Sequence, residues 1–488
     1  MVIESLKYKI LQQFGFAPTQ EQGQALDTFV SFLTDRDPQA VMILRGSAGT
    51  GKTSLSGAIV RTMLQIRQKV MLLAPTGRAA KVFSLGSGAP AYTIHRRIYR
   101  EKAFAGVDGQ FGLNDNLYTD TLFMVDEASM IANMGLGGTT FGSGCLLDDL
   151  VKFVYQGHND RLLLIGDKAQ LPPVGEEESP ALSASVMEGY GLKVYECDLN
   201  EVLRQSQSSG ILYNATLIRQ MITHDAVTGL PLIRFKGFAD IVMMPGAELV
   251  ESLGDSYHHV GMDETMVITR SNKRANIYNN GIRNMVLDRE EELSSGDMLM
   301  IVKNNYFWTE NEKKESGEGS AGAVPAFLAN GDRAKVLRVS NYIELYGFRF
   351  ATLLLQLPDY DDYEMQVTGM LDTLQSEAPA LTHEQQEELF RQVEEDYQHF
   401  VPLKADRMKS IRQDAYFNAL QIKYAYAVTC HKAQGGQWAH VYVDQGYMTD
   451  DMLTPDYIHW LYTAFTRATD KLFLVNWPKE QTCEPTDL

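Results

Sequence analysis

Cysteine is scarce in this sequence, which has four in 488 residues. Cys145, Cys197, Cys430 and Cys483 show no C-x-x-C spacing and no nearby pair of histidines, so the spacing gives no support to a zinc site. Reduced structural thiols are the better interpretation, because disulfides are rare in the cytoplasm.

Long apolar runs are also missing. No stretch reaches the roughly 20 residues that a membrane-spanning helix needs. The N-terminal MVIESLKYKIL has neither a basic leader nor a small-residue cleavage site. We therefore expect a cytoplasmic protein.

Basic residues are outnumbered, with 44 Lys and Arg against 62 Asp and Glu, and the formal net charge is −18. This balance argues against a protein that coats nucleic acid by its overall charge. A local basic groove remains compatible with it because the acid is unevenly placed. Between Leu357 and Phe400 the only Lys or Arg is Arg391.

What the chain does contain is a series of short apolar runs that alternate with helical patterns and turn residues. Such runs are typical of parallel strands covered by helices on both faces, as in α/β domains. The first group of runs is AVMIL (40–44), VMLLA (70–74), LFMV (122–125), RLLLIG (161–166) and KVYECDL (193–199). The second group is MVIT (266–269), VYVD (441–444) and LFLV (472–475).

A differently patterned stretch lies between these groups. SSGDMLMIV (294–302), NGDRAKVLRVS (330–340) and IELYGFRFATLLLQL (343–357) alternate and are punctuated by turns, which predicts a small antiparallel β module. An acidic helical insert follows and opens at Thr382, where T-x-x-Q forms a capping box. The plan is two α/β domains, the second interrupted by a β module.

The strongest local signal is GSAGTGKT, which follows an apolar strand and opens a helix. It satisfies G-x-x-x-x-G-K-[ST], a loop whose backbone N–H groups surround phosphate oxygens. Lys52 would neutralise the β and γ phosphates, and Thr53 would hold Mg²⁺. The nucleotide-binding residues of the loop are Gly46, Ser47, Ala48, Gly49, Thr50, Gly51, Lys52 and Thr53.

A pair of carboxylates ends the run LFMV. Asp126 and Glu127 would stand at the C-terminal edge of the sheet, where open α/β sheets bind ligands. Asp126 would bind Mg²⁺ through water, and Glu127 would polarise an attacking water. A structural role at the strand end is the alternative.

The decapeptide GDKAQLPPVG (166–175) ends another apolar run. Pro172 and Pro173 restrict the backbone of the segment that follows this predicted strand. If this strand neighbours the one that carries Asp126, Gln170 falls within reach of the γ-phosphate and the attacking water. The alternative is a structural turn, with Asp167 as a cap and Gln170 solvated.

Eight motifs together resemble the superfamily 1B DNA helicases of the RecD and Dda type. Besides GSAGTGKT and GDKAQLPPVG they are APTGRAAK (74–81), TIHR (93–96), VDEAS (125–129), LNEVLRQ (199–205), TCHKAQG (429–435) and YTAFTRA (462–468). The resemblance implies an ATP- and Mg²⁺-dependent motor with two RecA-like domains that moves 5′ to 3′ on single-stranded DNA and unwinds duplex.

The resemblance also assigns individual residues. Gln22 in PTQEQGQA corresponds to the residue that recognises adenine, Gly435 belongs to the nucleotide-binding set, and Arg204 and Arg467 match the arginine fingers. Positions that contact DNA in the family are Pro75, Thr76, Thr93, His95, Thr429 and His431. A lone histidine is more often a core or capping residue, and only the motif context favours DNA contact. Local positive charge would come from Lys81, Arg96, Arg97 and Lys432.

The implied organisation has a β-hairpin pin at 96–119, tipped by Phe104 or Phe111, although either ring could instead pack inside the hairpin. The first RecA-like domain is 1–95 and 120–199, and the second is 200–292 and 413–488. Residues 293–412 form an SH3-like module with the acidic insert, and in it Tyr306 and Trp308 are interpreted as core aromatics rather than base-stacking ones. A monomer that binds single strands and junctions is expected.

Three features depart from the family pattern or lack a functional account. Gln437 stands where many relatives carry an acidic residue, and no role is assigned to Gly135–Cys145 or to the insert at 357–400. Two other classes of protein stay open: a DNA-stimulated ATPase that clamps or remodels DNA without processive unwinding, and a metabolic P-loop enzyme that ignores DNA.

Overall fold

The computed structural model describes residues 2–105, 108–134, 142–202, 208–223, 229–316, 324–325, 327–401, 403–449 and 452–483. Arg204 and most of the Gly135–Cys145 segment lie outside these residues, and so does the side chain of Phe104. The chain divides into two compact units. The first comprises 1–244, 433–439 and 447–488, and the second comprises 245–432 and 440–446.

The first unit contains a six-stranded parallel sheet in the order β3-β2-β6-β7-β1-β8. All five predicted runs of the first group are strands in it. The sequence reading missed only the short edge strand β3. The bounds are β1 (Ala40–Gly46), β2 (Lys69–Ala74), β3 (Ala91–Thr93), β6 (Thr121–Val125), β7 (Arg161–Gly166) and β8 (Lys193–Leu199).

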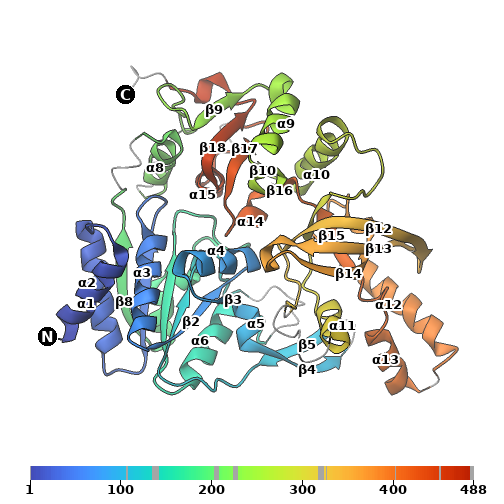
Figure 1. Cartoon of the computed structure of the whole chain (residues 1–488), viewed down its shortest axis with the longest axis horizontal. Coiled ribbons are helices and arrows are strands. Elements are labelled where there is room, and N and C mark those ends of the chain that lie inside the picture. Colours follow the sequence, from blue (N-terminus) through green and yellow to red (C-terminus); the bar gives the residue numbers. More distant parts are fainter. Residues whose placement is uncertain are drawn as a thin grey trace. The chain divides into compact units, whose positions relative to one another are not determined.

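Helices cover both faces of this sheet because its strands are apolar on both sides. Met42 and Leu44 of β1 pack with α1, α2 and α3, which stand beside one another in Figure 1. Val41 and Ile43 point to the opposite face and pack with α5 and α6. The helices of this unit are α1 (Val2–Phe14), α2 (Gln20–Thr34), α3 (Lys52–Gln65), α4 (Gly77–Ser87), α5 (Ile94–Ile98), α6 (Leu146–Gln156), α7 (Ala184–Gly189), α8 (Gly210–Thr223) and α15 (Pro455–Phe465).

The predicted hairpin is present as β4 (Tyr99–Ala105) and β5 (Asp108–Leu113). The two strands pair antiparallel, with Tyr99 opposite Leu113 and a register irregularity between Glu101 and Ala103. Phe111 is half-buried and packs against the same core cluster as α5 and α6. Its ring therefore supports the hairpin from inside, as the packing alternative allowed.

The second sheet has the order β16-β10-β17-β18-β9. The three predicted runs form β10 (Thr265–Thr269), β17 (Trp438–Asp444) and β18 (Ala468–Val475), and the strands β9 (Ile241–Met244) and β16 (Ala427–Thr429) were not predicted. Its described ladders are parallel. Helices in the second unit include α9 (Leu249–His259), α10 (Asn272–Gly281) and α14 (Cys430–Ala433).

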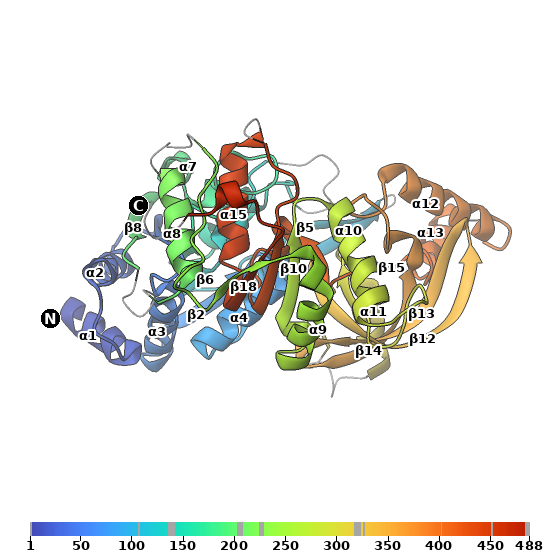
Figure 2. The same ribbon diagram turned by 90° about the horizontal axis from the view of Figure 1, so that it is seen from above.

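The predicted β module is a closed five-stranded barrel in the second unit. Its strands are β11 (Met298–Ile301), β12 (Arg333–Leu345), β13 (Phe348–Leu357), β14 (Tyr363–Met370) and β15 (Leu420–Tyr424). The last strand lies beyond the expected boundary at 412, because the chain returns through α12 (His383–Gln398) and α13 (Lys404–Arg412) before it closes the barrel. The long strands and these two helices are seen together in Figure 2.

The acidic insert expected at 357–400 is only partly helical, because residues 363–370 form the barrel strand β14. The helix within it is α12, which begins with the predicted capping box between Thr382 and Gln385. Only Leu389 and Val393 of this helix are buried, and they pack on the barrel with Phe350. Phe390 and Tyr397 are half-buried against the same cluster, and the outward face of the helix is solvated as expected. Tyr306 stacks on Phe327, with ring centroids 4.6 Å apart, and so the interpretation of Tyr306 as a core aromatic is confirmed.

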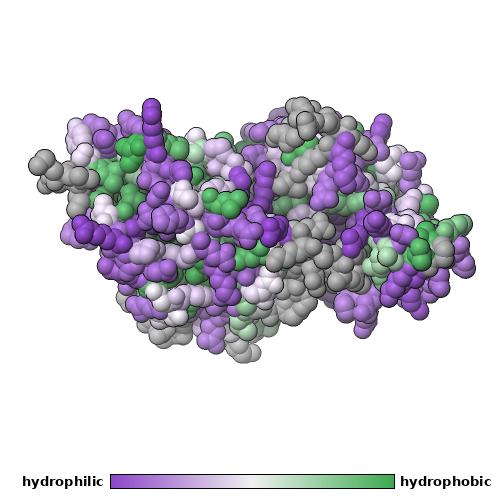
Figure 3. All heavy atoms as spheres, turned by 90° about the horizontal axis from the view of Figure 1, so that it is seen from below, coloured by the Kyte–Doolittle hydropathy of each residue, from purple (hydrophilic) through white to green (hydrophobic). Residues whose placement is uncertain are grey.

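Trp308 is the other aromatic near the barrel, in α11 (Phe307–Ser316). Its indole Nε1 donates to the carbonyl oxygen of Asn418 at 3.0 Å, so it too is held within the fold. On the face drawn in Figure 3, hydrophobic residues are scattered among hydrophilic ones outside the grey atoms. No helix among the described residues is long and apolar enough to cross a membrane.

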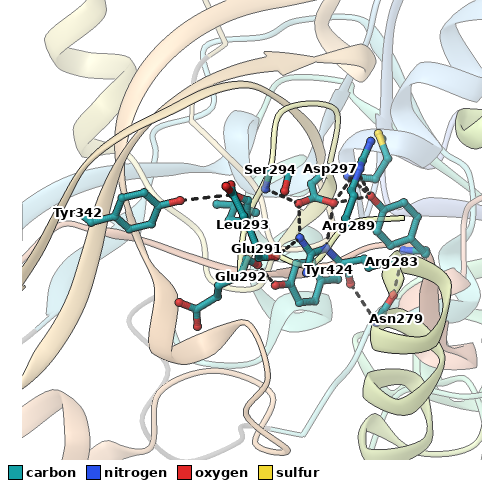
Figure 4. A network of polar contacts seen from close by, with 12 residues as sticks. Asn279, Arg283, Arg289, Glu291, Glu292, Leu293, Ser294, Asp297, Tyr342 and Tyr424 are labelled. Atoms are coloured by element: carbon teal, nitrogen blue, oxygen red, sulfur yellow. Dashed lines mark hydrogen bonds and ion pairs between the residues drawn. The ribbon is translucent and has the colours of Figure 1, made fainter. Parts of the chain in front are cut away.

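A buried charge cluster joins the second sheet to the barrel within the second unit (Figure 4). Asp297, immediately before β11, is fully buried and accepts two hydrogen bonds of 3.0 Å from Arg283, one of 2.6 Å from Arg289 and one of 2.7 Å from the Tyr426 hydroxyl. Tyr426 lies on the chain that returns from β15 to β16. One carboxylate therefore binds both chain connections between the sheet and the barrel.

We expect Asp297→Ala to lower the free energy of unfolding by about 3–5 kcal/mol, because it leaves the Arg283 guanidinium buried without a counter-ion. The bound guanidinium lowers the pKa of Asp297 against the opposing effect of burial. Its contribution is therefore present above the pKa of an unfolded aspartate and is lost as pH falls through the lower folded value. Chemical denaturation at several pH values measures both effects.

Glu292→Gln is the matched control. It removes a partly exposed ion pair with Arg349, and it should cost less than about 1 kcal/mol. Equal losses in the two variants would contradict the role given to Asp297.

Candidate functional site

The loop after β1 has the geometry of a phosphate-binding turn. Gly49 and Gly51 have φ of +78° and +77°, a backbone conformation that side chains other than glycine rarely adopt. Gly51 precedes the first turn of α3, so the N–H groups of that turn face the loop. Lys52 Nζ folds back onto the carbonyl oxygen of Gly46 at 2.8 Å.

The two carboxylates lie at the end of β6, as predicted. Burial and the charge of Glu127 raise the pKa of Asp126 to about 6, and the charge of Lys52 opposes this rise. Glu127 has a left-handed backbone, with φ 53°, a strained conformation that is common at active sites. Its Oε2 is buried and has no hydrogen-bond partner in the described structure.

Gln170 follows β7, which pairs with β6 as the argument from sequence required. Its side chain is 6% exposed, and its Oε1 is buried without a partner among the described residues. The alternative of a solvated glutamine is therefore wrong, because Pro172 and Pro173 are themselves buried and hold the loop inward. Asp167 does cap the turn, since it accepts from the N–H of Ala169 at 2.9 Å.

These residues fit a magnesium nucleotide. Two buried oxygens at the ends of adjacent strands, Glu127 Oε2 and Gln170 Oε1, have no hydrogen-bond partner among the described residues. Buried polar atoms are seldom left unsatisfied. A nucleotide phosphate with its cation and attacking water would supply those partners. Thr53 follows Lys52 in the first turn of α3, directly after the glycine turn.

Sequence reasoning missed the contacts that α15 makes with this site. The Tyr462 hydroxyl accepts from the N–H of Ala48 at 3.0 Å and donates to Asp167 Oδ2 at 2.6 Å. The next residue, Thr463, accepts from the N–H of Leu171 at 2.8 Å. Because Tyr462 follows Asp167 by almost 300 positions, no local pattern indicates these contacts.

Arg219 was also missed. This residue of α8 donates from Nη1 to the Ser47 hydroxyl in the phosphate-binding loop at 2.6 Å. Helix α8 packs against α15 (Figure 2). Burial raises the pKa of Tyr462, and the positive charge of Arg219 opposes this rise. An arginine in an amphipathic helix reads as a surface cation, so the sequence pattern gives no signal for this position.

Gln22 is 1% exposed and lies under the phosphate-binding loop. Its Nε2 donates to the carbonyl oxygen of Thr50 at 2.9 Å, and its Oε1 accepts from the N–H of Thr19 in a capping box. Gly435, also expected on the nucleotide side, has φ +72° and lies against Thr76, where a Cβ would come within 3.1 Å of the Thr76 hydroxyl.

Arg467 follows α15 and is 2% exposed. Its guanidinium donates to the carbonyl oxygens of Thr463 and Gly436, both at 3.1 Å, and to the Thr466 hydroxyl. Within the described part of the chain, this buried cation is held by these carbonyl and hydroxyl oxygens and by no carboxylate. Arg204, the other expected arginine, lies outside the described residues.

The expected DNA-contacting residues of the first unit gather at the starts of two helices. The hydroxyls of Thr76 and Thr93 cap α4 and α5, which follow the adjacent strands β2 and β3. Pro75 directly precedes the first cap. Burial lowers the pKa of His95 to about 4, so its imidazole is neutral near pH 7, as expected for this position.

Among the neighbouring basic residues, Arg97 lies 3.7 Å from the ring centroid of Tyr92 and Arg96 lies 5.1 Å from it. Lys81 is half-buried in α4. In the second unit, Thr429 ends β16 and His431 is exposed in α14. Burial lowers the pKa of Lys432, next to His431, to about 8.

Two protein families match the chain. Residues 17–229 match the AAA domain family, and residues 424–475 match the UvrD-like helicase C-terminal domain. The phosphate-binding loop, the paired carboxylates and Gln170 fall in the first match, and Arg467 falls in the second. The chain therefore contains a segment similar to AAA domains and a later segment similar to the C-terminal domain of UvrD-like helicases.

Two individual proteins are similar to part of this chain. The ATP-dependent RecD2 DNA helicase of Deinococcus radiodurans is 30% identical over 157 residues, which are 32% of this chain and 18% of the relative. An uncharacterised protein of Methanocaldococcus jannaschii is 34% identical over 168 residues, 32% of this chain and 13% of that protein. The matched segments thus span less than a fifth of either relative. These similarities support the resemblance to superfamily 1B helicases of the RecD type that the motifs show.

Among solved structures, the Bacteroides Pif1 helicase in complex with ADP-AlF3 and single-stranded DNA has a TM-score of 0.45 and 13% identity. The superposition covers 96% of this chain and 95% of that one.

Proposed function

We propose that this protein is an ATP-dependent DNA helicase that moves 5′ to 3′ along single-stranded DNA and unwinds duplex. The observation that carries the ATPase part is a pair of buried oxygens at the ends of adjacent strands, Glu127 Oε2 and Gln170 Oε1, which have no partner in the described part of the chain. They lie in a sheet whose β1 leads directly into the phosphate-binding loop.

Each residue has a role that its position supports. Lys52 and the loop N–H groups would bind the β and γ phosphates, and Thr53 and Asp126 would hold Mg²⁺, which neutralises phosphate charge when bound. Glu127 would orient and polarise the attacking water, and Gln170 would contact both this water and the γ-phosphate. Phosphoryl transfer needs little covalent help, so these tasks are positioning and charge stabilisation.

Arg467 and Arg204 would complete the positive charge on the γ-phosphate. A buried guanidinium held only by carbonyl and hydroxyl oxygens, as Arg467 is, retains its affinity for an anion. We propose that Arg467 exchanges these partners for phosphate oxygens when ATP binds. Gln22 would contact adenine from its place under the loop, and Gly435 would belong to the nucleotide-binding set.

Single-stranded DNA would bind through its backbone. Helix N-termini such as those capped by Thr76 and Thr93 present N–H groups to phosphates, and a neutral His95 suits a contact that reads no base. Pro75, Thr429 and His431 would extend this contact. Binding should therefore be indifferent to sequence and weaken with salt.

We further propose that the β4–β5 hairpin separates the strands ahead of the motor. Its place between α5 and β6 puts it next in the chain to Thr93 and His95. We keep Phe104 as the candidate for the tip of the hairpin. Phe111 packs on the core and would hold the base of the hairpin in place. The protein would act as a monomer at junctions of single and double strands.

Strand displacement tests this function. We expect unwinding of a duplex with a 5′ single-stranded tail, no unwinding of one with a 3′ tail, and loss of both ATP hydrolysis and unwinding in Lys52→Ala. Hydrolysis that is stimulated by DNA without any unwinding would instead identify a clamp or remodeller. A preference for the 3′ tail would contradict the proposed direction.

A further inference from the structure

The hydroxyl of Tyr462 occupies an unusual position, because it bonds directly to the backbone of the phosphate-binding loop. The side chain is 1% exposed, and burial together with Asp167 raises the pKa of its phenol well above the ordinary value, so the group keeps its proton. It therefore donates to Asp167 Oδ2 at 2.6 Å and accepts from the N–H of Ala48 at 3.0 Å. Both hydrogen-bonding functions of the phenol are used.

The same face of α15 holds the loop that carries Gln170. His459 Nδ1 donates to the carbonyl oxygen of Ala169 at 2.9 Å, and the Thr463 hydroxyl accepts from the N–H of Leu171 at 2.8 Å. Gln434 donates to the carbonyl oxygen of Leu171 at 2.7 Å. Because Gln170 lies between two residues that are fixed in this way, its side chain follows the position of α15.

Arg467 is tied to the same turn of helix. Its Nε donates to the carbonyl oxygen of Thr463 at 3.1 Å, so Thr463 contacts the Gln170 loop through its hydroxyl and Arg467 through its backbone. Tyr462 and Thr463 thus connect three parts of the candidate site: the phosphate-binding loop, the Gln170 loop and Arg467.

A nucleotide would compete with Tyr462 for the Ala48 N–H. Backbone N–H groups of this loop are donors to phosphate oxygens, and a charged acceptor forms a stronger hydrogen bond than a neutral phenol does. The Asp167 carboxylate behind the phenol adds repulsion to any phosphate that approaches it. Tyr462 and the phosphate therefore cannot both keep their preferred places.

We propose that Tyr462 is a positioning residue that couples phosphate binding at Ala48 to the Gln170 loop and Arg467. A phosphate oxygen takes the Ala48 N–H, the Tyr462 hydroxyl leaves it, and the shifted turn of α15 carries Leu171 and Arg467 with it. This inference rests on the proposed function, since the movement matters only in a protein that binds ATP and DNA together.

The test is the affinity for an oligothymidine strand, measured by fluorescence anisotropy with Mg²⁺ and either AMP-PNP or ADP. In the wild-type protein we expect the two affinities to differ by about 5–150-fold, the usual range of coupling between two sites. In Tyr462→Phe the difference should shrink to within about twofold, while the KM for ATP changes much less than the DNA-stimulated kcat. A purely structural tyrosine would lower the melting temperature and leave the affinity ratio unchanged.

Tyr155→Phe is the matched control, because it removes the hydroxyl of a half-buried tyrosine that donates to Ala40 at the opposite end of β1. It should keep the wild-type ratio. Thr463→Val, which removes the acceptor of the Leu171 N–H, should lose the ratio as Tyr462→Phe does. If Tyr462→Phe and Thr463→Val both keep the wild-type ratio of DNA affinities, the coupling role of Tyr462 is wrong and the proposed function is unaffected. A wild-type ratio near one overturns the proposed motor and this coupling with it.

Discussion

Replacement of Glu127 by glutamine is expected to lower kcat for ATP hydrolysis by about 10²–10⁴-fold, the contribution of a well-placed general base. The amide keeps the shape of the side chain but cannot take a proton from water. Glu127 Oε2 is buried and has no partner among the residues that the structure describes, and Glu127 has a strained backbone with φ 53° at the end of β6. The KM for ATP should change little, because the proposed function assigns phosphate binding to Lys52 and the loop and not to Glu127. Steady-state hydrolysis with saturating DNA measures both constants.

Glu188→Gln is the control for this variant, since it neutralises an exposed carboxylate at the end of α7 in the same unit. It should behave as the wild-type protein does. A Glu127→Gln protein that is folded and retains more than about a tenth of the wild-type kcat would exclude Glu127 as the base.

Replacement of Arg467 by alanine is expected to lower kcat by about 10³–10⁵-fold, the range found for arginine fingers. The reason is that a planar guanidinium can bind two phosphate oxygens at once and stabilises the charge that develops during transfer. ATP binding should persist, because the phosphate-binding loop is untouched. Single-turnover hydrolysis together with binding of a fluorescent ATP analogue separates the two effects.

The buried position of Arg467 requires a folding control, since its three hydrogen bonds fix the end of α15. Arg467→Lys keeps the positive charge but loses the two-pronged geometry, and we expect it to retain the fold and recover only a small part of the rate. A folded Arg467→Lys protein with nearly wild-type kcat would show that this guanidinium does not contact the transferred phosphate.

The sheet of the first unit could be predicted because its strands are buried on both faces and therefore read as continuous apolar runs. Every residue of β7 is buried, for example, so its apolar run can be recognised in this sequence by itself. The three-residue strands β3 and β16 are too short to show a period. β9, with the sequence IVMM, has only four residues. These short strands are strands only because they form hydrogen bonds with the longer strands beside them.

The closure of the barrel could not be predicted from the sequence either. The strand β15 follows two helices and pairs with β11 and β14 only in the folded structure, which moved the end of the barrel past the expected boundary. The register between distant segments is set by three-dimensional packing, so it leaves no local trace.

For the candidate site, the residues at the ends of strands could be predicted from the sequence, but the contacts between distant segments could not. Gln170 was placed correctly at the edge beside Asp126 and Glu127, because adjacent parallel strands end together. Its burial came from the inward-facing prolines, whose orientation depends on packing. The contacts of Tyr462 and Arg219 with the phosphate-binding loop join residues far apart in the chain, and only the folded structure reveals them.

ATP hydrolysis in the presence and absence of single-stranded DNA tests the central claim most directly, namely that the loop around Lys52 hydrolyses ATP in response to bound DNA. We predict a low basal rate, a steep rise with oligothymidine, and no hydrolysis in Lys52→Ala under either condition. A rate that ignores DNA, or hydrolysis that survives the loss of Lys52, would contradict the account.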